Sequence, residues 1–126
     1  MNATSEQDLK AISTIDKASK IIDEAVELLI EKKIEPLDFR LWQVAAELEY
    51  ASFLISMNHR LADYFPDLSD INQNNEALDS LIGKTQEILG NVASILVSNP
   101  REAYNRAKKA TALVRRVQSI LRKTSR

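Results

Sequence analysis

His59 is the chain's single histidine and the first residue to consider for acid–base or metal chemistry. The chain has no cysteine, so a zinc site would lack enough nitrogen and sulfur ligands. A carboxylate-bridged di-metal bundle needs Glu-x-x-His pairs on facing helices, and none occurs here. Asp63 follows His59 by one helical turn, which favours a local side-chain pair on a polar face. We therefore expect no catalytic residue, no metal and no cofactor.

A second group of residues, basic ones near the C-terminus, has the composition of a polyanion-binding surface. Residues 1–99 carry 8 Lys or Arg and 17 Asp or Glu, whereas residues 100–126 carry 9 and 1. The basic side chains form two heptad-spaced rows on one predicted helix: Arg101, Lys108, Arg115 and Arg122, and Lys109, Arg116 and Lys123. Such a surface can hold a nucleic-acid backbone or an acidic protein. With no aromatic or amide residue interleaved, nucleic-acid binding would be independent of sequence.

The two basic rows have an alternative explanation within the fold. Asp16, Asp23 and Glu27 lie along one flank of the first predicted helix, where like charges one turn apart repel unless a basic group is near. In an up-down-up-down bundle the last helix lies beside the first. One basic row would then pair with this acidic flank, and the other with a second subunit. We favour this interpretation over polyanion binding, and we expect no membrane binding.

The stretch 39–65 holds six of the seven aromatic residues and shows two apolar stripes at helical spacing. The first comprises Leu41, Val44, Leu48, Ala51, Ile55, Asn58, Ala62 and Phe65. The second contains the residues that we predict to form a protein interface: Trp42, Tyr50, Phe53, Met57, Leu61 and Tyr64. Aromatic and Met side chains are typical of the buried centres of interfaces. Asn58, a polar residue in the first stripe, either sets helix register or faces water.

Periodicity and capping residues predict one all-α domain over residues 1–126. Two glycines and three prolines are too few for a fold rich in tight turns. The predicted helices are 5–33, 37–64, 70/76–98 and 100–123, with Ser5 and Asn99 as N-caps. Short connections between helices of matched length favour an antiparallel up-down-up-down four-helix bundle. A last helix swapped to a partner and an elongated dimer are alternatives.

Two local features of the third predicted helix are open. Residues 66–75 form either a loop or, from Ser69, a helical turn. Gly83 and Gly90 lie one heptad apart on the same face, where they either permit a close helix crossing or are incidental surface residues.

The sequence predicts an assembly role for the chain. No apolar run approaches the ~20 residues of a membrane-spanning helix, and the polar N-terminal segment does not resemble a signal peptide, so we expect a soluble cytoplasmic protein. No phosphate-binding loop or nucleophile motif occurs. We expect a non-enzymatic protein that acts in protein–protein interaction, as a homodimer formed through the second stripe of residues 39–65. The alternative function is nucleic-acid binding through the C-terminal helix.

Overall fold

The computed structural model describes residues 5–72 and 77–124. Within them the chain forms five α-helices and one 3-10 turn, and no strand. The elements in order are α1 (Glu6–Ile30), α2 (Ile34–His59), η1 (Ser69–Asn72), α3 (Leu78–Leu89), α4 (Val92–Ser98) and α5 (Pro100–Thr124). The all-α class predicted from periodicity is confirmed, and so is the helical turn at Ser69. Residues 73–76, part of the predicted loop and helix start, lie outside the described residues.

Both predicted N-caps form. The Ser5 hydroxyl accepts from the N–H of Asp8 at 3.1 Å, and the Asn99 side chain accepts from the N–H of Glu102 at 3.2 Å. These contacts satisfy N–H groups that the first turn of a helix leaves without an internal acceptor.

Other helix boundaries differ from the prediction. Helix α1 ends at Ile30 rather than at 33, and Lys32, just beyond it, has a positive φ of 59°. Helix α2 begins before Pro36, because proline in a first turn removes no internal hydrogen bond. It ends at His59 rather than 64, since Arg60 adopts a left-handed conformation (φ 55°, ψ 52°) that stops the helix. The third predicted helix is broken into α3 and α4 at Gly90-Asn91, two residues of low helix propensity.

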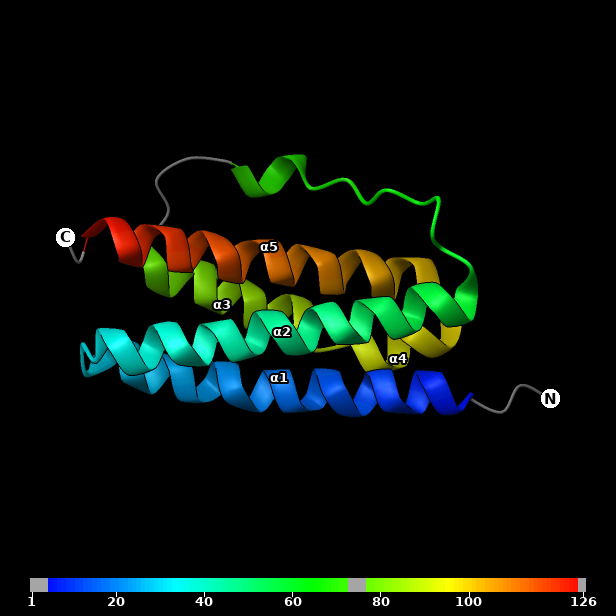
Figure 1. Cartoon of the computed structure of the whole chain (residues 1–126), viewed down its shortest axis with the longest axis horizontal. Helices are drawn as coiled ribbons and strands as arrows, with labels where there is room; N and C mark the ends of the chain where they lie inside the picture. Colours follow the sequence, from blue (N-terminus) through cyan, green and yellow to red (C-terminus); the bar gives the residue numbers. More distant parts are fainter. Residues whose placement is uncertain (1–4, 73–76, 125–126) are drawn as a thin grey trace.

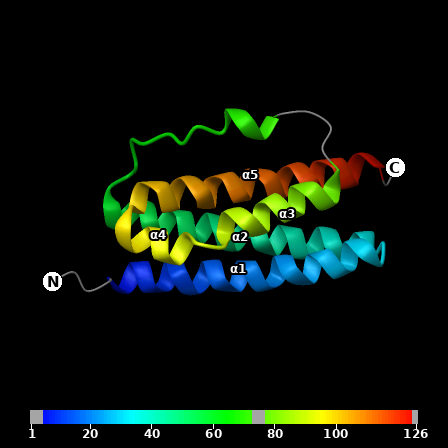
Figure 2. The same cartoon turned by 180° about the vertical axis from the view of Figure 1, so that it is seen from behind.

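The helices form a four-helix bundle in which α3 and α4 together make the third rod (Figure 1). Helix α1 packs against α2, α2 against α5, and α5 against α3 and α4, which return to α1. Neighbouring rods are antiparallel (Figures 1 and 2). The predicted antiparallel bundle is therefore present.

The path of the chain through the bundle differs from the expected up-down-up-down order. After α2 the chain runs back along the bundle as an extended segment, so that α3 starts at the same end as α2 and runs parallel to it (Figures 1 and 2). This is possible because α2 stops at His59, so that the residues that follow it, up to and including η1, can run back along the bundle (Figure 1). As a result α5 lies beside α2 and diagonally across from α1.

One connected core fills the bundle. The first stripe of residues 39–65 supplies it with five completely buried side chains: Leu41, Val44, Leu48, Ala51 and Ile55. Past the end of α2 this pattern fails, and Phe65 is 85% exposed. The close crossing at Gly83 and Gly90 is also wrong. Both are exposed, no other atom lies within 4 Å of a Cβ built at Gly83, and Gly90 meets only carbonyls of its own helix.

Candidate functional site

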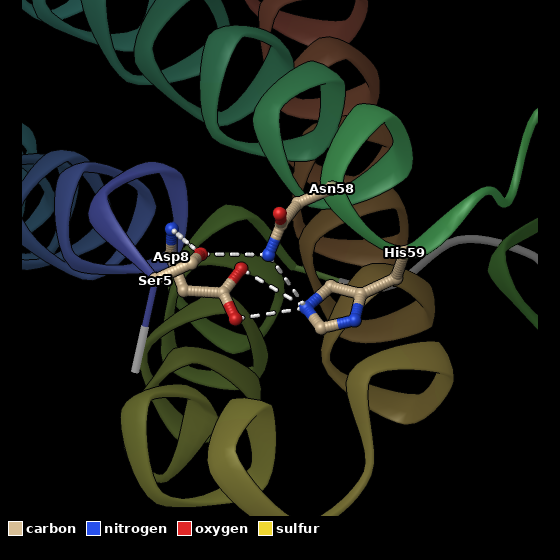
Figure 3. A network of polar contacts seen from close by, with 4 residues as sticks. All are labelled: Ser5, Asp8, Asn58 and His59. Carbon is tan, nitrogen blue, oxygen red and sulfur yellow. Dashed lines mark hydrogen bonds and ion pairs between the residues drawn. The ribbon is translucent and has the colours of Figure 1, made fainter. Parts of the chain in front are cut away.

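A polar cluster joins the N-terminus of α1 to the C-terminus of α2 (Figure 3). His59 Nε2 lies 2.8 and 3.0 Å from the two carboxylate oxygens of Asp8, which is buried. Asn58 Nδ2 donates to Ser5 Oγ at 2.7 Å. The 3.3 Å contact between Asn58 Nδ2 and His59 Nε2 joins two nitrogens and adds little, because Nε2 gives its proton to Asp8.

The contacts of this cluster fit a structural role rather than that of an activated nucleophile. Ser5 Oγ already accepts from the Asp8 N–H and from Asn58 Nδ2, and His59 Nε2 points at Asp8 rather than at the hydroxyl (Figure 3). An activated nucleophile would instead need the imidazole on its hydroxyl. The cluster therefore sets the register of α1 against α2.

Two sequence-based interpretations are decided by this cluster. Asn58 does not simply face water, because it donates to Ser5 of the neighbouring chain segment across the α1–α2 contact. The local pair of His59 with Asp63 does not form, because the helix ends between them and Asp8 takes the imidazole. Asp8 lies 51 residues from His59 in sequence. Its position in the first turn of a helix indicated only a favourable charge near the cap, so the sequence did not predict this contact. Among the described residues no cluster of three or more metal-binding side chains occurs.

The outward face of α2 is apolar and exposed. We define the outer stripe as Phe39, Trp42, Ala46, Tyr50, Phe53 and Met57. Its large side chains are between 42% exposed, at Tyr50, and 65% exposed, at Met57. The Phe39 and Trp42 rings stack at 6.3 Å between centroids, and Lys10 Nζ of α1 lies 5.9 Å from the centre of the Tyr50 ring. The stripe is thus a contiguous apolar surface along most of the helix.

Two residues of the predicted interface do not belong to this stripe. Leu61 is 7% exposed and belongs to the core. Tyr64 is half-buried, packs edge-on against Tyr104 at 6.1 Å and lies under Arg101 at 5.0 Å. The physical reason is the left-handed Arg60, which ends the helical periodicity on which the prediction depended. Phe39, omitted from the predicted set, takes their place at the other end.

The first basic row of α5 turns toward α2. Arg115 pairs with Glu49 at 2.8 Å, and Arg122 lies 3.8 Å from the Asp38 carboxylate. Gln118 supports the same helix pair, since its Nε2 donates to Asp38 Oδ1 at 3.2 Å. The expected neutralisation by acidic groups therefore occurs for these two arginines. The expected partner helix is wrong, because α1 lies across the bundle and the acids belong to α2.

The second basic row is divided between two sides of α5: Lys109 lies beside α3 and η1, whereas Lys123 lies toward α2. Lys109 and Arg116 are only partly exposed. Lys109 lines a hollow together with Ile71 of η1. The pKa of the Asp67 carboxyl lies below its usual value, chiefly because of hydrogen bonds from the Ser69 backbone N–H and side chain, and to a smaller extent because of the positive charge of Lys109. The predicted polyanion-binding residues are thus distributed over several environments, with Lys108 half-buried and Lys123 exposed.

A groove separates α2 from α5 and brings together residues that the sequence did not connect. Its volume is about 710 Å³, and its lining consists of Trp42, Ala45, Ala46, Glu49, Arg115, Gln118, Ser119, Arg122 and Lys123. No aromatic residue of α5 is among these lining residues, but Trp42 of the neighbouring helix supplies one. No local spacing could reveal this pairing, since it depends on α5 lying beside α2.

No helix in the described part of the chain is both apolar and long enough to span a bilayer. No protein-family model matches the sequence, and no curated protein or solved structure is measurably similar to it.

Proposed function

We propose that this protein is a non-enzymatic assembly module that associates with a second copy of itself through the outer stripe of α2. The observation that supports the proposal is the concentration of exposed aromatic and Met side chains on one helix face. Interfaces are enriched in these residue types, and their energetic centres in Trp and Tyr.

The size of the stripe supports the same proposal. Its five large side chains are about half exposed, so they present on the order of 500–600 Å² if each has the ~200 Å² of an aromatic residue. That is at the upper end of the ~300–600 Å² expected for the largest apolar patch of a monomer. It approaches the ~800 Å² that each partner contributes to a standard interface. Flanking residues of α1 and α5 would supply the remainder as a polar rim.

The experiment is a charge insertion in the stripe. Phe53→Glu with Met57→Glu places two carboxylates in the proposed interface, where burial without a partner costs several kcal/mol per charge. We expect size-exclusion chromatography with light scattering to show a dimer for the wild type and a folded monomer for the variant, with unchanged helicity by circular dichroism.

The chain offers a matched control outside the stripe. Ile30 and Val97 are 74% and 66% exposed on other elements, so Ile30→Glu with Val97→Glu adds the same charge without touching the stripe. The control is expected to remain dimeric. A wild type that elutes as a monomer at high concentration contradicts the proposal, and so does a control variant that dissociates equally.

A further inference from the structure

We propose that the groove between α2 and α5 binds a ligand with a planar aromatic ring and a phosphate group, as in a mononucleotide or the terminal nucleotide of a single strand. The groove shares Trp42 and Ala46 with the outer stripe, whereas Phe53 and Met57 do not line it, so variants at Phe53 and Met57 can separate ligand binding from self-association. The observation behind it is that the indole ring of Trp42 and three cationic side chains of α5 line the same groove.

The shape of the groove fits a small ligand. Three of its lining residues have small side chains, Ala45 and Ala46 from α2 and Ser119 from α5, and these leave room between the larger residues. The volume of about 710 Å³ lies within the ~300–1,000 Å³ that ligand sites of this kind occupy.

The aromatic wall is held in position. Trp42 lines the groove, and its ring stacks on Phe39 at an interplanar angle of 20°. Two aromatic rings that support each other lose less side-chain freedom on binding than an isolated exposed ring would. Stacking of a base on an aromatic side chain contributes about 1–3 kcal/mol in single-strand complexes and tolerates any base.

The opposite wall is positively charged. Arg115, Arg122 and Lys123 line the groove, and they outnumber the two carboxylates beside them, Glu49 and Asp38. Arg115 and Arg122 are oriented by Glu49 and Asp38, and both side chains are more than half exposed despite these pairs. Guanidinium groups bind phosphate through paired N–H donors. Gln118 Nε2 is engaged with Asp38, and stacking on an aromatic ring tolerates any base, so we expect little base selectivity.

The protein carries its own probe for this groove, because Trp42 is the single tryptophan of the chain. We expect AMP to quench the Trp42 emission in a saturable titration, with a Kd between about 10 µM and 1 mM. Adenosine, which lacks the phosphate, should bind at least about tenfold more weakly. Inorganic phosphate should leave the emission unchanged, since it cannot stack. Equal quenching by adenosine and AMP would overturn the proposal.

Two charge variants test the cationic wall. Arg115→Gln with Lys123→Gln should weaken AMP binding about tenfold, because two cations next to the phosphate are lost. Lys20→Gln with Lys32→Gln removes the same charge from exposed positions elsewhere and should leave the affinity within a factor of about two. Equal losses in both variants would reduce the effect to net charge and overturn the assignment to this groove.

Two further titrations are needed. One compares a single strand with a free nucleotide as the ligand, and the other measures AMP binding by the variant that disrupts the proposed dimer interface. Oligothymidylate that binds at least tenfold more tightly than AMP would assign the site to single strands, and equal affinities would assign it to free nucleotides. The Phe53→Glu, Met57→Glu variant should bind AMP at least as tightly as the wild type does, because a dimer that covers Trp42 and Ala46 would compete with the ligand for them. Loss of binding in that variant, or quenching by an acidic peptide but not by AMP or oligothymidylate, would overturn the proposal.

Discussion

Helix α2 has an apolar outer face and helix α5 has a basic one, and the two faces differ in how far other residues of the chain engage them. The basic face of α5 is largely engaged within the chain: Arg115 and Arg122 meet acids of α2, and Arg101 lies over Tyr64 in the returning segment. The apolar outer stripe of α2 has no comparable cover among the described residues. Its contacts are Lys10 beside Tyr50 and the stacking of Phe39 on Trp42.

The difference favours one of the two faces as the surface for the proposed partner. A basic surface can be balanced by acids in the same bundle, and exposed ion pairs of this kind cost or contribute little, typically below ~1 kcal/mol. An apolar surface is stabilised only when another apolar surface covers it. The outer stripe is therefore the stronger candidate for a partner, and the basic face of α5 contributes mainly where it meets Trp42.

The largest expected effect separates the two faces of α2. In the monomeric Phe53→Glu, Met57→Glu background, Leu48→Ala should lower the free energy of unfolding by about 3 kcal/mol, because it leaves a cavity in the core. Phe39→Ala, in the outer stripe, should change it by less than about 0.5 kcal/mol. Urea unfolding followed by circular dichroism measures both. A large loss for Phe39→Ala would mean that the stripe stabilises the monomer and is not a surface for a partner.

An intermediate effect is expected from the polar cluster that holds the end of α2. Asp8→Ala leaves the His59 ring nitrogen without its acceptor, and the loss of a partly buried hydrogen bond should cost about 1–3 kcal/mol. Asp63→Ala, at the exposed position four residues after His59, should cost less than about 0.5 kcal/mol. Thermal and urea unfolding at fixed pH compare the pair. Equal effects would contradict the observed Asp8–His59 contact.

The smallest effect is expected from the ion pairs that engage α5. Arg115→Glu places a carboxylate beside Glu49 and should lower stability by about 0.5–1 kcal/mol, with less effect at high salt. Adding Glu49→Arg should restore most of the loss, since the swapped pair recreates the contact. A double-mutant cycle by urea unfolding gives the coupling. Zero coupling would show that the basic face is not engaged by α2 and would weaken the contrast with the outer stripe.

Sequence periodicity and capping were sufficient for the fold class, the helix N-caps and most of the core, but not for the ends of the helices or for the chain path. The stripe from Leu41 to Ile55, the caps at Ser5 and Asn99, and the all-α class follow from local rules of spacing and hydrogen bonding. The order of helices around the bundle depends on where α2 ends, and that depends on one left-handed residue, Arg60, that no propensity rule identifies. This single difference moved Leu61 and Tyr64 out of the predicted interface.

The contacts between distant residues were out of reach for the same reason. Asp8 with His59, and Trp42 with Arg115 and Arg122, become neighbours only once α1 and α5 are placed against α2. Each set combines residues whose separate patterns suggested other roles. Asp8 was a first-turn acid, Trp42 part of an apolar stripe and the arginines part of a basic row. Their joint chemistry is a property of helix packing.

The central claim is that the outer stripe of α2 holds a second copy of the chain. Sedimentation velocity on the wild type over a concentration series tests it most directly. The account predicts a species of twice the 14.2 kDa chain mass at high concentration, giving way to a single chain on dilution or when Phe53 and Met57 are replaced by Glu. A wild type that sediments at 14.2 kDa at every concentration would contradict it.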